Sequence, residues 1–330
     1  MMRAPEFWGG DGSGLMPFLL SPLASLYGAA TARRMARPGW QAPVPVICCG
    51  NATAGGAGKT TVALDLGQRL ANRGVAVQFL LRGYGGRLKG PVRVDPMLHD
   101  SQAVGDEALL LAAERPAWIS ADRAAGAQAA IAAGAQTILM DDGLQNPSLL
   151  KDLSLLIIDG NFGFGNNRII PAGPLREPVA AAAARCRAAV LIGEDETNAA
   201  ARLPPGMRVL RAHLRPGPET EMLAGQPVHA FCGIANPKKF FATLAEAGAV
   251  VAGRSAFADH YPYDAGDMRD ILAEAEALRA IPVTTRKDFV RIPPAFRSRV
   301  TVVTIRLEWE DSAAIEALLD PLAQRVPIPA

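Results

Sequence analysis

The feature that most constrains this chain is a glycine-rich segment, Thr53-Ala-Gly-Gly-Ala-Gly-Lys-Thr60, set between two regular elements. The apolar stretch Val44–Cys49 before it predicts a buried strand, and Lys59–Arg73 after it predicts a helix. Strand, glycine turn and helix in this order are the context of a P-loop, whose pattern ends in Gly-Lys-Ser/Thr. The competing interpretation is a glycine-rich turn with an incidental lysine, and the flanking elements argue against it.

The residue types in this loop suit the phosphates of a nucleotide. Gly55, Gly56 and Gly58 let backbone N–H groups face phosphate oxygens, and the helix N-terminus adds a positive dipole end. Lys59 is expected to reach the β- and γ-phosphates of ATP, and Thr60 to ligate Mg²⁺. The expected ATP-binding residues are Thr53, Ala54, Gly55, Gly56, Ala57, Gly58, Lys59 and Thr60.

Acidic residues at a neighbouring strand end are the next requirement of a magnesium–nucleotide site. Asp141 and Asp142 follow one apolar stretch, and Asp159 follows another. Adjacent carboxylates repel each other unless a cation lies between them, and Gly143 allows a close approach to the loop. Asp141 and Asp142 are therefore preferred, although an aspartate that ends a strand is also a common turn residue.

Short apolar runs alternate with helical ones through most of the chain, which is typical of a doubly wound α/β fold. The runs Ala188–Ile192 and Val300–Ile305 are among those expected to form strands. A Pro- and Gly-rich stretch, Leu203–Pro218, interrupts this alternation and predicts a boundary. The expected fold is α/β, with a P-loop NTPase-like, mainly parallel sheet in residues 41–215 and a smaller α/β domain in residues 216–330. Residues 1–40 are expected to form an apolar, membrane-associated helix.

The N-terminal segment carries no charge from residue 12 to residue 32, and three arginines follow closely. Large apolar side chains recur there at helical spacing, at Leu15, Leu19, Leu23, Leu26 and Tyr27. A secretory signal is disfavoured because the basic cluster follows the apolar stretch, and two prolines weaken a spanning helix. A helix lying in the membrane interface accounts for both features, while a spanning helix and an ordinary buried helix remain open.

Composition excludes several classes of protein. The net charge of +2 over 330 residues, without a basic stripe, does not indicate a nucleic-acid-binding protein. The four cysteines show no CxxC spacing, so neither a zinc site nor a disulfide framework is expected. Cys48 and Cys49 are expected to be buried thiols that point to opposite faces of a strand.

Several further segments accompany the loop in a fixed order. They are Leu81-Arg-Gly-Tyr-Gly-Gly86, Val104-Gly-Asp-Glu107, Asp141-Asp-Gly-Leu-Gln145, Pro171-Ala-Gly-Pro-Leu-Arg-Glu-Pro178, Gly233-Ile-Ala-Asn-Pro237, Phe257-Ala-Asp-His260 and Thr285-Arg-Lys-Asp288. Together they resemble the tetraacyldisaccharide 4'-kinase family, from the apolar N-terminus to about Arg306. Thr53 at the start of the loop is shared with that family, in place of the general pattern's glycine.

This resemblance implies a function. ATP would phosphorylate the 4'-hydroxyl of tetraacyldisaccharide 1-phosphate, giving lipid IV-A in lipid A biosynthesis. The implied partners are this glycolipid and a membrane surface, at the cytoplasmic face of the bacterial inner membrane, where the chain is peripheral or N-terminally anchored. No obligatory protein partner is inferred.

The resemblance also implies roles for particular residues. Asp106 and His260 match the family's proposed catalytic pair, with Lys59 as the third catalytic residue; unaided, Asp106 predicts a helix N-cap and His260 a surface residue. The implied metal ligands are Thr60, Asp141, Asp142 and Glu177. Substrate or phosphate contacts are expected from Arg82, Glu107, Arg123, Gln145 and Arg176, and each arginine could instead form a structural salt bridge.

This chain departs from the family in two places. Leu144 and Asn146 stand where the family commonly has phenylalanine and histidine, and Thr61 stands where it commonly has proline. The change at Asn146 leaves open whether that position takes part in metal or phosphate binding.

Two other P-loop classes compete with the kinase. A MinD-like membrane-switching ATPase would carry a signature lysine where this chain has Ala54, and its membrane helix is usually C-terminal. A soluble ligase resembling dethiobiotin synthetase would not need the apolar N-terminus. The sequence favours the kinase over both.

Overall fold

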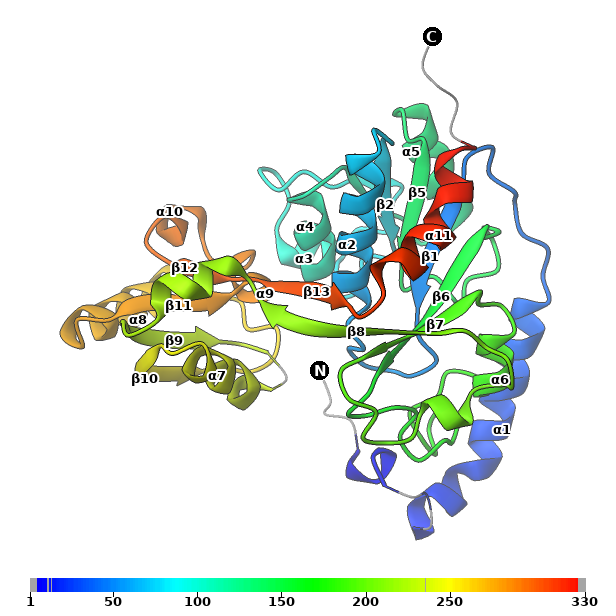
Figure 1. Ribbon diagram of the computed structural model, residues 1–330, viewed down its shortest axis with the longest axis horizontal. Helices are drawn as coiled ribbons and strands as arrows, with labels where there is room; N and C mark the ends of the chain where they lie inside the picture. The colour runs from blue at the N-terminus through cyan, green and yellow to red at the C-terminus, as the bar shows by residue number, and fades with distance from the viewer. Residues whose placement is uncertain (1–4, 11, 13, 235, 326–330) are drawn as a thin grey trace.

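The computed structural model describes residues 5–10, 12, 14–234 and 236–325. Figure 1 shows a larger body of sheet and helices joined by two long strands to a smaller one. The larger body, here called the large unit, is built on a nine-stranded sheet ordered β13-β8-β7-β6-β1-β5-β2-β4-β3. The smaller body, the small unit, is built on a four-stranded sheet ordered β10-β9-β11-β12.

Most strands of the large sheet run parallel, and only the edge pairs β3–β4 and β8–β13 are antiparallel. The central strands are buried along their whole length because helices cover both faces. The strands are β1 (Val46–Gly50), β2 (Val77–Leu81), β3 (Val92–Arg93), β4 (Ala117–Ile119), β5 (Thr137–Asp141), β6 (Leu153–Asp159), β7 (Ala188–Ile192), β8 (Val209–Pro216) and β13 (Ile305–Trp309).

Two apolar cores lie on the opposite faces of this sheet. Helices α2 (Lys59–Asn72), α4 (Asp106–Ala112) and α11 (Ser312–Ala323) contribute to the core that contains Cys49. Helices α5 (Arg123–Ala132) and α6 (Val179–Ala183) contribute to the core that contains Cys48. The doubly wound arrangement is confirmed, and the two adjacent thiols are buried on opposite faces as expected. Shorter helical segments are η1 (Glu6–Trp8), α3 (Ser101–Val104) and η2 (Ala200–Arg202).

The small unit has a parallel sheet with its own apolar core around β9. Its strands are β9 (Pro227–Cys232), β10 (Val250–Ala256), β11 (Ile281–Thr285) and β12 (Thr301–Val303). Its helices are η3 (Pro218–Leu223), α7 (Pro237–Glu246), α8 (Ala265–Ala277), α9 (Arg286–Phe289) and α10 (Pro294–Arg297). In Figure 1 this unit lies on the far side of the molecule from α1.

Two expectations about the secondary structure near the connection between the units were wrong. The stretch Leu203–Pro218 does not simply interrupt the alternation, because Val209–Pro216 forms strand β8 with prolines and glycines only at its ends. The single strand expected over Val300–Ile305 is two strands in two sheets, β12 and β13. Because β13 and α11 rejoin the large sheet, we propose that the small unit comprises residues 217–304 rather than 216–330.

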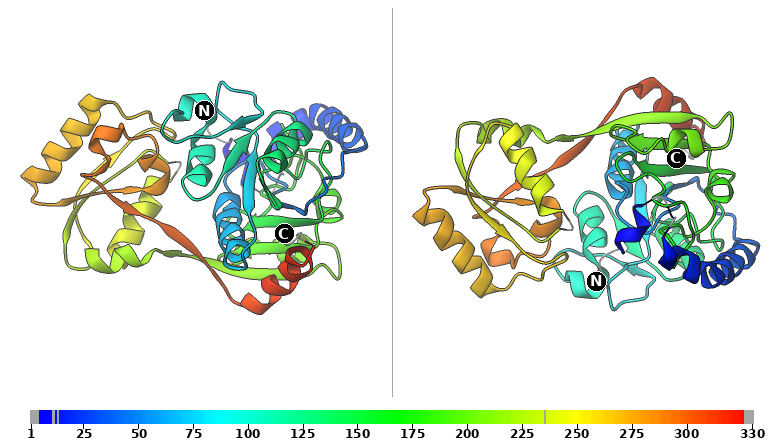
Figure 2. Two further views of the ribbon diagram at one scale, coloured as in Figure 1. Left: turned by 90° about the horizontal axis from the view of Figure 1, so that it is seen from above. Right: turned by 90° about the horizontal axis from the view of Figure 1, so that it is seen from below.

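Helix α1 (Leu15–Met35) lies along the outside of the large unit, at the end away from the small unit (Figure 2). Its buried positions are Pro17, Ala24 and Thr31, and Arg168 Nη1 donates to Ser21 Oγ at 3.2 Å. The leucine ridge faces outward, with Leu15, Leu19, Leu23 and Leu26 all exposed. The helix is long and apolar enough to cross a membrane by length and composition alone, with a mean hydropathy of 1.3. Because 17% of that window is buried, α1 is not a core helix.

Candidate active site

The glycine-rich loop follows β1 at the centre of the large sheet and leads into α2. Gly58 has φ +81°, and a Cβ there would lie 2.6 Å from Ile192 Cδ1, so only glycine fits this position. A Cβ on Gly55 or Gly56 would meet no atom within 4 Å. The rim of the loop therefore faces open space, which leaves room for phosphate oxygens beside the backbone N–H groups.

Lys59 lies folded over this loop. Its Nζ donates to Asn51 Oδ1 at 3.0 Å and to the Gly55 carbonyl at 3.3 Å, and it lies 3.8 Å from Asp142 Oδ1. The side chain is 9% exposed, so its charge is held close to the loop. This position suits an ammonium group that binds the outer phosphates of a nucleotide.

Thr60 and Asp141 are brought together at the start of α2. Thr60 Oγ1 donates to Asp141 Oδ2 at 2.7 Å, while the buried Asp141 Oδ1 has no hydrogen-bond partner. Burial, and then the charge of Glu107, raise the pKa of Asp141 well above its usual range. A hydroxyl and an under-satisfied buried carboxylate are the hard oxygen ligands that Mg²⁺ prefers, so these two residues fit that ion.

The other two expected metal ligands are held by arginines. Asp142 accepts from Arg176 Nη1 at 2.9 Å and 3.0 Å, and although burial opposes its charge, Lys59 and Arg176 keep its pKa below the usual range. Glu177 accepts from Arg185 Nη2 at 2.6 Å. Within the described part of the chain, no three His, Cys, Asp or Glu side chains form a metal-binding group. Metal ligation by Asp142 and Glu177 stays a prediction.

The segment Pro171–Pro178 forms one wall of the loop. Ala54 N–H donates to the Pro174 carbonyl at 2.7 Å, and Arg176 N–H donates to the Ala52 carbonyl at 2.7 Å. Gln145 Nε2 joins this wall to the loop, because it donates to Glu177 Oε1 at 2.8 Å and to the Asn51 carbonyl at 2.9 Å. Arg176, Glu177 and Gln145 are therefore gathered at the loop, as expected.

Arg82 follows strand β2 and Arg123 follows strand β4, so both lie beyond the carboxyl ends of strands in the large sheet. Arg123 begins α5 and is buried, its Nη1 donates to the Ser120 carbonyl, and its Nε has no partner. Burial, and then the charge of the exposed Arg82, lower the pKa of Arg123 to about 10. Two close guanidinium groups with an unsatisfied donor suit a phosphate group, which would offset their mutual repulsion.

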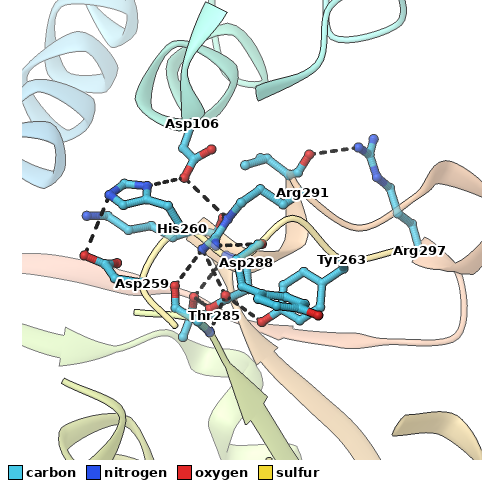
Figure 3. Close-up of polar contacts among 12 residues, drawn as sticks. Asp106, Asp259, His260, Tyr263, Thr285, Asp288, Arg291 and Arg297 are labelled. Atoms are coloured by element: carbon cyan, nitrogen blue, oxygen red, sulfur yellow. Dashed lines mark hydrogen bonds and ion pairs between the residues drawn. The ribbon is translucent and has the colours of Figure 1, made fainter. Parts of the chain in front are cut away.

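Asp106 and His260 meet across the two units (Figure 3). His260 Nδ1 lies 2.7 Å from Asp106 Oδ2, and His260 N–H donates to the Gly233 carbonyl at 3.0 Å. The expectation that Asp106 caps a helix was wrong, since Gly105 is the N-cap of α4 and the Asp106 side chain faces His260 instead. The hydrogen bond to Asp106 raises the pKa of His260, which is 44% exposed.

This geometry sets the chemistry available to the pair. A carboxylate acceptor requires the proton of neutral His260 to sit on Nδ1, which leaves the Nε2 lone pair free to accept a proton. Nε2 lies 3.8 Å from Asp259 Oδ2, which is beyond hydrogen-bond distance. The pair can therefore act as a general base toward a hydroxyl group.

Asn146 has a structural role in this chain. Its Oδ1 accepts from Ser148 N–H at 3.1 Å and Ser148 Oγ at 2.9 Å, which closes a turn after the Asp141–Gln145 segment. Leu144 is 1% exposed and packs beside Gly50, where a Cβ would come within 2.4 Å of Leu144 Cβ. Leu144 and Asn146 are thus accommodated by local packing and hydrogen bonding.

Sequence reasoning missed two residues of the site. Asn51 orients Lys59, and Arg291 lies 3.4 Å from Asp106 through its Nε. Asn51 lies two residues before the loop segment, between the strand and Thr53, so its amide could have been considered as a partner for the lysine. Arg291 follows Asp288 by one helical turn, and that spacing was its one signal.

Comparisons with known proteins cover nearly the whole chain. Residues 16–324 match the family model described as tetraacyldisaccharide-1-P 4'-kinase. The chain is 54% identical over 326 residues to the tetraacyldisaccharide 4'-kinase of Rhodospirillum rubrum, covering 97% of this chain and 98% of the relative. It is 56% identical over 319 residues to that of Gluconacetobacter diazotrophicus, again covering 97% and 98%.

A solved structure shares the fold. It is the "apo" form of LpxK from Aquifex aeolicus in complex with ATP, which superposes with a TM-score of 0.76 at 25% sequence identity. The match covers 93% of this chain and 99% of that one.

Proposed function

The chain belongs to the tetraacyldisaccharide-1-P 4'-kinase family, and from this premise we propose that it transfers the γ-phosphoryl group of ATP to the 4'-hydroxyl of tetraacyldisaccharide 1-phosphate. The product is lipid IV-A, so the enzyme is a kinase of lipid A biosynthesis. The membrane-switching ATPase is not favoured, because the family match runs from residue 16 to residue 324. The observation that carries the catalytic assignment is the 2.7 Å contact between His260 and Asp106.

The reaction needs a proton acceptor for the sugar hydroxyl. His260 Nε2 takes the 4'-hydroxyl proton as the hydroxyl oxygen bonds to the γ-phosphorus, and the bond from that phosphorus to the β–γ bridging oxygen breaks to release ADP. Asp106 holds the Nδ1 proton of His260 and stabilises the imidazolium that forms. Because phosphoryl transfer has a loose transition state, the proton leaves the hydroxyl late.

The loop and its neighbours hold the nucleotide. Backbone N–H groups from Gly55 to Thr60 surround the phosphates, and Lys59 moves from Asn51 to the β- and γ-phosphates. Bound Mg²⁺ would neutralise charge on those phosphates. Thr60 and Asp141 are the residues that would hold it, since Asp141 Oδ1 is buried without a partner.

The remaining polar residues position these groups. Arg176 holds Asp142 beside Lys59, and Gln145 with Glu177 fixes the wall of the loop. The charge of Glu107 raises the pKa of Asp141, so we assign Glu107 to the surroundings of the proposed metal position. We assign Arg82 and Arg123 to a phosphate group of the substrate or nucleotide, on the strength of the unsatisfied Arg123 Nε.

Helix α1 supplies the contact with the membrane. Its outward leucines would enter the apolar layer, and Arg33 and Arg34 in its last turn would meet anionic head groups. We therefore propose that the enzyme works at the cytoplasmic face of the inner membrane, on a glycolipid substrate held in that membrane. Peripheral attachment and an N-terminal anchor are both compatible with a helix of this length.

One incubation tests the proposal. The purified chain is mixed with ATP, Mg²⁺ and the disaccharide 1-phosphate glycolipid, and mass spectrometry follows the lipid. We expect the lipid to gain one phosphate. Turnover of ATP that requires a protein partner and leaves the lipid unchanged would instead support the switch ATPase.

A further inference from the structure

A buried arginine of the small unit, Arg291, contacts the catalytic pair formed by Asp106 and His260. The Arg291 side chain is 2% exposed, and its Nε lies 3.4 Å from Asp106 Oδ2, the same oxygen that contacts His260 Nδ1. Figure 3 shows this guanidinium beside Asp106 and the segment that carries His260. One side chain of the small unit thus contacts the carboxylate that the large unit contributes.

The same guanidinium binds two backbone carbonyls next to His260, that of the following residue and that of Gly233. Arg291 Nη1 donates to the Tyr261 carbonyl at 3.0 Å, and Nη2 donates to the Gly233 carbonyl at 3.0 Å. The Gly233 carbonyl also accepts the N–H of His260. His260 has φ +61°, a left-handed conformation that a residue with a Cβ adopts only when its surroundings hold it there.

Asp288 fixes the arginine in turn. This fully buried carboxylate accepts from Arg291 Nη2 at 2.9 Å, from Gly233 N–H at 2.6 Å and from the Tyr263 hydroxyl at 2.9 Å. A buried ion pair adds little to stability because desolvation offsets its attraction. The Arg291–Asp288 ion pair instead lies against Asp106 and the backbone next to His260, where it can hold these groups in place.

We propose that Arg291, held by Asp288, is a positioning residue that fixes Asp106 and His260 against each other across the two units. The inference rests on the proposed role of that pair as the proton acceptor. Arg291 turns Asp106 Oδ2 toward His260 Nδ1 and holds the strained His260 backbone, so that Nε2 keeps its lone pair toward the substrate. It acts through the pair and has no contact of its own with the P-loop.

The titration of His260 tests this without any assay of activity. The sequence has four histidines, so the ring signals of His260 can be followed by NMR in the full chain and assigned with His260→Asn. The charged groups that face His260 are Asp106, Asp259 and Arg291. Asp106 raises the pKa of His260 through its hydrogen bond, whereas the positive charge of Arg291 lowers it.

Because these two effects on the His260 pKa are opposite, the titration can distinguish a positioning role of Arg291 from a purely electrostatic one. If Arg291 positions the pair, Arg291→Gln should break the hydrogen bond between Asp106 and His260. The titration midpoint of His260 should then move to lower pH. If Arg291 acts only as a nearby charge, the midpoint moves to higher pH, and that result or no shift would overturn the inference. Arg291→Lys keeps the charge but lacks the forked donors, so it is expected to behave like Arg291→Gln.

Kinetics give the second readout. Displacing catalytic groups by about 1 Å can cost on the order of 100-fold, so we expect Arg291→Gln to lower kcat about 10- to 100-fold while KM for ATP changes less than about twofold. Added to His260→Ala, the same change should cost nothing further, because the pair it positions is already lost. If Arg291→Gln lowers kcat as much in the His260→Ala variant as in the unaltered chain, Arg291 does not act by positioning His260.

Controls keep the tests interpretable. Because Arg291→Gln leaves Asp288 buried without its cation, the double variant Arg291→Gln/Asp288→Asn removes both charges and guards against unfolding. Arg286→Gln is the matched control, since Arg286 pairs with Glu114 on the large unit and, over the residues that the structure describes, makes no polar contact with the catalytic pair.

Full activity in His260→Ala would contradict the proposed function. An inactive His260→Ala beside an active Arg291→Gln with an unshifted His260 would defeat this inference alone.

Discussion

The hydroxyl of Thr60 donates a 2.7 Å hydrogen bond to Asp141, a buried carboxylate whose second oxygen has no partner. A charge held in this way is costly in the free protein, because burial and Glu107 both favour the protonated carboxyl group. The same arrangement is favourable once a divalent cation lies beside it. The proposed metal position therefore lowers the stability of the folded protein as long as no cation is bound.

Asp141→Asn should separate stability from activity. The folded-state pKa of Asp141 lies above its unfolded value, so this group destabilises the free protein increasingly as pH rises from about 4 toward neutrality. The neutral variant should unfold at a higher temperature at pH 7.5, by about 2–4 °C for each kcal/mol gained, with little difference near pH 4. Its kinase activity should fall at least about 100-fold. A lower Tm at pH 7.5 in calorimetry without nucleotide would contradict this account of the site.

Lys59→Ala should abolish product formation. The ammonium group is the cation held over the loop, and no other lysine contacts Asn51 or Gly55 among the described residues. We expect at least about a 100-fold loss in the rate of lipid phosphorylation and weaker ATP binding by calorimetry. The exposed Lys238 provides a matched change, and Lys238→Ala should leave both quantities intact.

The pH dependence of kcat should follow His260. A general base must be unprotonated, so the rate should rise with pH through the His260 pKa, which the Asp106 hydrogen bond holds above 6.5. Asp106→Asn replaces the carboxylate by a neutral amide that no longer stabilises the imidazolium, so the acidic limb should move to lower pH while the maximum rate falls. Asp259 lies farther away, at 3.8 Å from Nε2, and Asp259→Asn should keep most of the rate. An acidic limb that stays in place in Asp106→Asn would rule out His260 as the group that titrates.

The outward face of α1 should govern attachment to lipid. Leu19→Ser/Leu23→Ser removes exposed apolar side chains without touching the buried Pro17, Ala24 and Thr31, so folding should be unaffected. Sedimentation with vesicles that contain anionic lipid should recover much less protein, and deletion of residues 1–36 should have the same effect. Met97 and Leu98 are 87% and 80% exposed outside α1, so Met97→Ser/Leu98→Ser controls for non-specific adsorption of apolar side chains to the vesicles. An unchanged membrane fraction in the deletion would reject the anchor.

Local patterns in the sequence predicted the large sheet and the loop well. Apolar runs gave strand β7 as Ala188–Ile192 with both bounds correct, and the loop needed only the order of strand, glycines and helix. Strand β8 was missed because proline and glycine near Leu203–Pro218 outweighed a weak alternation of buried positions. The split of Val300–Ile305 between two sheets depends on tertiary pairing, which no local pattern reports.

The catalytic pair shows the same limit. Asp106 and His260 are 154 residues apart, and from the residues alone each had an ordinary structural interpretation. Only the resemblance to a family joined them, and only the fold brought Arg291 to the same carboxylate oxygen. The sequence pattern of two adjacent aspartates also did not predict that Arg176 holds one of them, Asp142, whose role as a metal ligand remains a prediction.

The most direct test of the account is the rate at which one phosphate is added to the glycolipid in a single turnover, with ATP bound beforehand. The central claim is that the Asp106–His260 pair accepts the proton of the sugar hydroxyl. We predict that the unaltered chain phosphorylates the lipid, and that His260→Ala and Asp106→Ala bind ATP normally but transfer phosphate about 100- to 10,000-fold more slowly. Transfer at the full rate in either variant would contradict the claim.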